Sequence, residues 1–208
     1  MLIRWAEDAP NDPRPPWWRA TLNRRREADP DVVIADYREV LKRAPRHLEA
    51  LRGIADELDR GHRDSAAAEA YAALLAIHPD DSPGHAGAER NAAMLGDETA
   101  AISHLDRALA LDPLNAAAHL ERAKINLRHD EVGDALVHLD QVVASTPFDR
   151  DGHYQRSLAL RRLGKSDESK QELATFERLS RDQQEREALQ DRIAASPNNP
   201  ELESQLAR

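Results

Sequence analysis

The sequence contains no cysteine, and only 4% of its 208 residues are aromatic. The absence of cysteine excludes disulfide bonds, thiolate zinc sites and cysteine nucleophiles. Because aromatic rings are scarce, a buried core has to be built mainly from alanine and leucine. A mean hydropathy of -0.72 and 32% charged residues fit one elongated domain with a large exposed surface.

Long apolar runs and an excess of positive charge are also missing. No apolar run approaches the roughly 20 residues that span a bilayer, and the N-terminal residues lack the apolar core of a signal peptide. We therefore expect no membrane insertion and a cytoplasmic location. The 38 acidic residues outnumber the 29 basic ones, which gives a net charge of -9. Since phosphate binding requires a basic surface, nucleic acid is not an expected partner.

Similar residues recur every 34 positions along most of the chain. Prolines follow this period at Pro45, Pro79, Pro113 and Pro147. Large residues follow it at Tyr37, Tyr71, Leu105, Leu139 and Leu173, and smaller ones at Val33, Ala67, Ala101, Ala135 and Ser169. One fixed period through five copies indicates a structural repeat, because chance matches would slip in register.

The clearest copy of the repeat runs from Met94 to Pro113. Gly96 ends one helix there, residues 97–99 start the next, and Asp112-Pro113 stop it. A 34-residue helix–turn–helix with this punctuation resembles the tetratricopeptide repeat family, over about residues 14–180. The resemblance implies an all-α fold: a right-handed α-solenoid of about five helical hairpins with a C-terminal capping helix.

The predicted organisation has three parts. Residues 1–15 form an extended arm that contains Trp5, residues 16–180 form the repeat domain, and residues 181–208 form the capping helix and tail. The approximate repeats are 14–47, 48–81, 82–115, 116–149 and 150–183. The predicted hairpins pair residues 46–60 with 64–77, 82–95 with 98–111, 116–129 with 132–145, and 150–163 with 166 onward. Since neither glycine nor proline occurs between Lys165 and Ser196, the last segment is either one long helix or two helices joined near residues 180–182.

Catalytic motifs are missing from the sequence. The triplet His62-Arg63-Asp64 looks like the start of a kinase catalytic loop, but no glycine-rich phosphate loop or Asp-Phe-Gly accompanies it. Walker, dinucleotide-binding, His-Glu-x-x-His and Gly-x-Ser-x-Gly motifs do not occur either. We therefore expect no enzyme, no catalytic residue and no cofactor.

Histidines occupy two columns of the repeat, and these raise the question of a metal. One column holds His85, His119 and His153, and the other holds His104 and His138. Equivalent atoms of adjacent repeats should lie about 10 Å apart, whereas one metal ion needs ligand nitrogens about 2 Å away. We therefore interpret the histidines as packing in the hairpin seams and expect no metal site. A histidine-based metal protein or enzyme is the competing hypothesis.

In the resembling family the first helix of each hairpin lines a concave groove that binds ligands. We call the corresponding positions of this chain the first-helix face, and they are Trp18, Leu22, Arg25, Arg52, Asp56, Asp59, Ala86, Arg90, Ala93, Leu120, Lys124, Leu127, Tyr154, Leu158 and Arg161. From this set the predicted binding residues are the cations Arg52, Arg90, Lys124 and Arg161 and the apolar Leu120, Leu127, Tyr154 and Leu158. The cations can pair with carboxylates while the apolar side chains bury area. In the alternative, the charges are solvated and the C-terminal helix covers the apolar residues.

The predicted function is a non-catalytic scaffold or adaptor that binds a peptide or partner subunit, with an acidic segment, in this groove. The carboxylate clamp of co-chaperone members is disfavoured, because Asp56 and Gly87 stand where that clamp needs asparagines. An assembly factor or peripheral subunit that forms a homo-oligomer through its repeat ends is the alternative. Frequent arginine and alanine favour a bacterial source.

Overall fold

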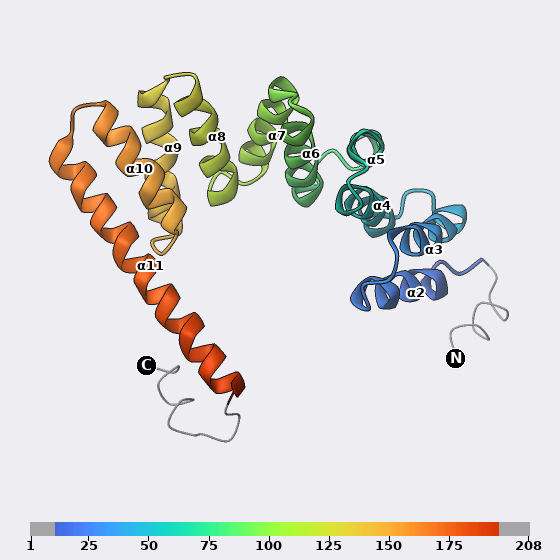
Figure 1. Ribbon diagram of the computed structural model, residues 1–208. Helices are drawn as coiled ribbons and strands as arrows, with labels where there is room; N and C mark the ends of the chain where they lie inside the picture. Colours follow the sequence, from blue (N-terminus) through green and yellow to red (C-terminus); the bar gives the residue numbers. More distant parts are fainter. Residues whose placement is uncertain (1–10, 196–208) are drawn as a thin grey trace. The chain divides into compact units, whose positions relative to one another are not determined.

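The structure is a computed structural model that describes residues 11–195, and all regular elements in that range are helices (Figure 1). The helices are α2 (Arg14–Arg25), α3 (Pro30–Arg43), α4 (Leu48–Arg60), α5 (Asp64–Ile77), α6 (Ser82–Leu95), α7 (Glu98–Leu111), α8 (Ala116–Arg128), α9 (Val132–Ser145), α10 (Arg150–Arg162) and α11 (Ser166–Ala195). From α4 to α10 the ends agree with the predicted hairpins to within two residues. The predicted arm residue Trp5 lies outside the described residues. Within residues 11–195, none of the helices combines the length and the apolar character that crossing a membrane requires.

Polar side-chain caps start the helices α3, α6, α7, α8 and α10. The carboxylates of Asp29 and Asp97 and the amide oxygen of Asn115 accept bonds from backbone N–H groups in the first turns of α3, α7 and α8. The first helix starts within the segment predicted as an extended arm: α2 begins at Arg14, whereas the arm was predicted to run to residue 15. Its N-cap is Pro13, and its first turn contains Pro15 and Pro16. Proline is tolerated there because the N–H groups of a first turn have no partner within the helix.

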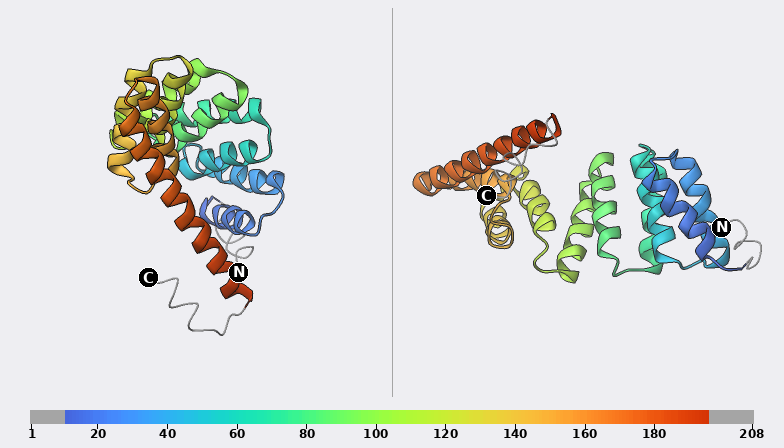
Figure 2. Two further views of the ribbon diagram at one scale, coloured as in Figure 1. Left: turned by 60° about the vertical axis from the view of Figure 1, so that its left-hand side comes forward. Right: turned by 90° about the horizontal axis from the view of Figure 1, so that it is seen from below.

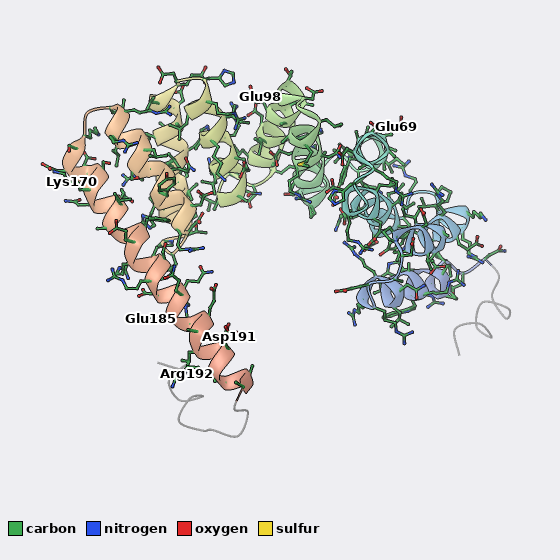
Figure 3. The ribbon with its side chains drawn as sticks, viewed as in Figure 1. Glu69, Glu98, Lys170, Glu185, Asp191 and Arg192 are labelled. Atoms are coloured by element: carbon green, nitrogen blue, oxygen red, sulfur yellow. The ribbon has the colours of Figure 1, made fainter. Side chains whose placement is uncertain are left out.

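The C-terminal segment is a single helix. Helix α11 continues from Ser166 to Ala195 without a break, so the alternative of two helices joined near residues 180–182 is wrong. Its first half packs against α10, and its second half continues past that hairpin (Figure 1). Figure 3 shows the charged side chains of Glu185, Asp191 and Arg192 along this second half.

The chain divides into two compact units, Met1–Pro113 and Leu114–Arg208. Unit 1 contains the hairpins α2–α3, α4–α5 and α6–α7, and unit 2 contains α8–α9 and α10–α11. Within each unit every helix lies beside the next one along the chain (Figure 2). The first helices of neighbouring hairpins also contact each other, α4 with α6 and α8 with α10. This stacking brings repeat-related positions of one unit side by side.

The core of each unit follows the repeated columns. Tyr71 and Leu74 are almost completely buried in unit 1, as are Ala135 and Leu139 in unit 2. Tyrosine fits its column in unit 1 because a glycine faces it. A Cβ atom placed on Gly87 would lie 2.5 Å from the ring of Tyr71, which is too close for any other residue without a shift of the ring.

Candidate partner-binding face

Two of the four predicted binding cations tie helices together inside their own unit. Arg52 on α4 donates two hydrogen bonds, of 2.9 and 2.6 Å, to the carboxylate of Asp81, which is the N-cap residue of α6. Lys124 on α8 lies 2.7 Å from Asp151 on α10 and 3.0 Å from Glu121. Burial lowers the pKa of Lys124, but its bonds with the two carboxylates outweigh this effect and raise it. Both cations are therefore neutralised by internal partners and connect successive first helices.

A third tie of the same kind joins α2 to α4. Arg24 lies 3.3 Å from Asp56 and 3.3 Å from the fully buried Glu57. The hydroxyl of Tyr71 donates a 3.0 Å hydrogen bond to Asp56, and burial followed by this carboxylate raises the pKa of Tyr71. Arg24 escaped the sequence prediction because it lies outside the first-helix face. Its spacing of 32 residues from Asp56, close to one repeat, is the signal that could have found it.

The other two predicted cations are exposed. Arg90 on α6 donates a 3.1 Å hydrogen bond to the carbonyl of Ala86 on its own helix, and it forms no ion pair within residues 11–195. Arg161 on α10 likewise has no ion pair in the described part of the chain. Of the four predicted binding cations, these two are the ones that remain available to an external carboxylate.

The predicted apolar residues, all in unit 2, are partly covered. Leu127 is buried, and Leu120 packs against the core cluster around Leu139. Leu158 is half-buried, whereas Tyr154 is 38% exposed and its ring contacts Phe176 of α11, with ring centroids 5.2 Å apart. The C-terminal helix therefore contacts this apolar surface at Tyr154 and leaves part of the ring exposed.

Unit 1 offers a more open apolar surface on the same face. Trp18 and Leu22 lie one turn apart on α2 and are 44% and 39% exposed. Trp17 packs against the core next to them and meets the edge of the Trp18 ring at a centroid distance of 4.7 Å. Trp17 is thus partly buried against the core, and its neighbour Trp18 presents indole surface to solvent.

The histidine columns meet inside the hairpins, with partners 19 residues apart. The Nδ1 atoms of His85 and His104 are 3.2 Å apart, and those of His119 and His138 are 2.8 Å apart. Burial, followed by the neighbouring His85, lowers the pKa of His104. Sequence reasoning compared each column only with itself and missed these pairs. In the described range, no group of three or more His, Asp or Glu side chains is arranged to hold a metal ion.

The stacked hairpins and their first-helix ties define a helical-repeat protein. Tetratricopeptide repeat family models match residues 22–82 and 92–161. The chain belongs to the tetratricopeptide repeat family, whose members in general bind proteins or peptides without catalysing a reaction.

Solved structures share this fold. MamA is 19% identical with a TM-score of 0.69 over 80% of this chain and 90% of its own. YrrB, described as a tetratricopeptide repeat protein with an unusual peptide-binding site, is 15% identical with a TM-score of 0.72 over 88% and 93%. PilF of Pseudomonas aeruginosa is 14% identical with a TM-score of 0.72 over 99% and 86%. A search of curated protein sequences gives no match. At these identities the structures establish the all-α solenoid fold and leave the partner open.

Proposed function

We propose that this protein is a non-catalytic scaffold that binds a protein or peptide partner through its first-helix face. In unit 1 the binding residues are Trp18, Leu22 and Arg90, and in unit 2 they are Leu158 and Arg161. The observation that carries the proposal is the contrast among the cations. Arg52 and Lys124 are neutralised by internal carboxylates, whereas Arg90 and Arg161 are exposed and form no ion pair within residues 11–195.

The chemistry of these groups favours a partner segment that carries both carboxylates and apolar side chains. Guanidinium groups bind carboxylates through paired hydrogen bonds, and tryptophan and arginine are enriched among the residues that dominate interface energies. Covering the exposed parts of Trp18 and Leu22 would contribute about 25 cal/mol per Å² of apolar area. The chain's own excess of acid makes each exposed arginine more selective, because like charges elsewhere on its surface repel an acidic partner.

Affinity capture with charge-reversal variants tests this proposal. The binding variant carries Arg90→Glu and Arg161→Glu. A matched control carries Arg38→Glu and Arg181→Glu, which change two exposed arginines of α3 and α11 and alter the net charge by the same amount. Circular dichroism first establishes that all proteins are equally helical. The wild type and the control should retain the same partners from a source lysate, and the binding variant should lose them.

The proposal fails if the binding variant retains the partners as well as the control does. A third variant, Trp18→Ala, separates the apolar from the ionic contribution. We expect it to weaken binding by about tenfold or more, as truncation of a central aromatic side chain does in other interfaces. Surface plasmon resonance with an identified partner measures this change.

A further inference from the structure

Three hairpins place a pair of titratable side chains at the same two positions of their seams. These seam pairs are His85–His104 between α6 and α7, His119–His138 between α8 and α9, and His153–Glu172 between α10 and α11. The first member of each pair is at least nine-tenths buried. Two seams thus pair two imidazoles, and the third pairs an imidazole with a carboxylate.

Hydrogen-bond partners assign the protons of the first seam. Nε2 of His85 lies 2.9 Å from the carbonyl oxygen of Pro79, which can only accept, so Nε2 carries the hydrogen. In a neutral ring Nδ1 of His85 is then an acceptor, and His104 has to donate its own Nδ1 hydrogen across the 3.2 Å contact. A contact of this length has room for one bridging hydrogen. Protonation of both Nδ1 atoms would set two donors and two positive charges against each other.

The third seam has the opposite requirement. Nε2 of His153 lies 3.0 Å from the carbonyl of Pro147, and its Nδ1 lies 2.6 Å from the carboxylate of Glu172. Both partners accept from the ring, so both nitrogens donate, as they do in an imidazolium ion beside an ionised carboxylate. Arg156 binds the other oxygen of Glu172 and also donates a 2.8 Å bond to Asp140. This seam is therefore held by an imidazolium ion and a carboxylate, whereas a His–His seam cannot hold both of its rings as imidazolium ions.

Charged groups around the first seam are paired with each other. Arg107 on α7 donates to the same Pro79 carbonyl as His85 and pairs with Asp80. Asp81 pairs with Arg52, and Glu89 is buried one turn after His85 on α6. At the second seam, Arg122 on α8 occupies the repeat position that Arg156 has at the third.

We propose that the two His–His seam pairs are proton-sensitive latches, which loosen the α6–α7 and α8–α9 hairpins as the solution becomes mildly acidic while the His153–Glu172 seam stays closed. Histidine in an unfolded chain titrates near pH 6.5, and in the folded protein burial, followed by the neighbouring His85, lowers the pKa of His104. The unfolded state consequently binds more protons in this window, and the folded state loses stability as pH falls through it. Each proton of difference changes the unfolding equilibrium constant by up to about tenfold per pH unit.

Urea unfolding at pH 7.5 and 5.5, at low protein concentration, tests the latches. The test variant carries His104→Gln and His138→Gln, because an amide can donate to or accept from the facing imidazole and does not titrate. The control is His62→Asn, a change at an exposed turn histidine with a positive φ that asparagine tolerates. In the wild type and the control, the unfolding equilibrium constant should be larger at pH 5.5 than at pH 7.5. In the test variant this ratio of the two constants should be at least tenfold smaller. An equal ratio in the control and the test variant overturns the proposal.

A second variant, His138→Glu, gives the second seam the chemistry of the third. The carboxylate introduced at position 138 faces His119 and has Arg122 where the third seam has Arg156. The protection factors of the α8–α9 amides, which compare each exchange rate with its intrinsic rate at the same pH, should then rise at pH 5.5 relative to pH 7.5, whereas in the wild type they should fall. If acid lowers the protection factors equally in α8–α9 and α10–α11 of the wild type, the seam pairs are not the latches.

Discussion

The turns inside the hairpins repeat one backbone conformation with different residues. A positive φ occurs at Glu27, His62, Gly96, Asp130 and Gly164, which are 34 or 35 positions apart. This left-handed conformation ends a helix and suits glycine, because side chains with a Cβ atom pay a steric cost there. In the second turn the left-handed residue is His62 rather than Gly61, whose φ is -83°. The repeat therefore conserves the left-handed backbone conformation of the turn even where the residue is not glycine.

The substitution Glu27→Gly should stabilise the protein for this reason. Glutamate has a long side chain with no special tolerance of a positive φ, and glycine removes the steric cost, for a gain of about 0.5–1 kcal/mol in the free energy of unfolding. The reciprocal change Gly96→Ala should lower the free energy of unfolding by about 1 kcal/mol. Gly96 has a φ of 74°, and no atom lies within 4 Å of the added Cβ, so the loss would come from the backbone conformation alone. Urea denaturation measures both values. If Glu27→Gly destabilises the protein, the side chain of Glu27 contributes more stability than its left-handed backbone conformation costs.

Buried positions were predictable from the sequence at this scale, and side-chain pairs were not. Tyr71 and Leu139 are buried as their shared column predicts, whereas Leu173, the last member of that column, lies on α11 and is 39% exposed. The partner of Arg52 was not predictable in the same way. Its carboxylate, Asp81, lies 29 residues away, so the contact depends on the reach of two side chains across neighbouring helices rather than on the period.

The helices themselves were largely predictable because their ends carry local signals. Capping aspartates, prolines in the first turn and polar turns each act within a few residues, so their effect does not depend on the rest of the fold. The length of α11 was not settled by such signals, since charged helix formers fit one long helix as well as two short ones. The ion pair between Arg52 of α4 and Asp81 at the start of α6 was also not predictable from local signals, because it depends on how two helices pack.

Arg52→Ala should weaken the contact between α4 and α6. The side chain of Asp81 is 5% exposed, so the loss of Arg52 leaves a buried carboxylate with its backbone bond to Gly84 and without its two guanidinium bonds. A loss of about 1–3 kcal/mol in unfolding free energy is expected for a charged group left short of partners. Arg90→Ala is the matched control on the first-helix face and should change stability by no more than about 0.5 kcal/mol.

Thermal and urea unfolding of the two variants separate a structural role from a binding role. If Arg52 supports the fold and Arg90 contacts a partner, Arg52→Ala lowers stability, and Arg90→Ala lowers partner affinity at unchanged stability. Equal stability of the two variants would contradict the assignment of Arg52 as a tie.

For the whole molecule, the sequence determined the fold class far better than the binding site. A 34-residue period constrains all residues of a repeat at once, so five copies leave little freedom for another architecture. A binding surface is constrained by its partner, which leaves no period in the chain. The predicted set of cations accordingly contained both internal ties and exposed groups, and only the ion pairs of Arg52 and Lys124 distinguished the two kinds.

The last prediction concerns the two compact units as separate proteins. In repeat proteins stability is approximately the sum of the repeats and their neighbouring interfaces, and about three repeats are needed for independent folding. Unit 1 has three hairpins with two core clusters of its own, so a fragment of residues 1–113 should be helical and unfold cooperatively. Unit 2 has two hairpins, the second of which contains the long α11, so a fragment of residues 114–208 should unfold at a lower urea concentration.

Circular dichroism during urea titration compares the two fragments. If the second fragment is the more stable one, the packing of α11 on α10 contributes more than a complete repeat, and the ion pairs of Glu172 and the contact of Phe176 with Tyr154 become the interactions to remove next.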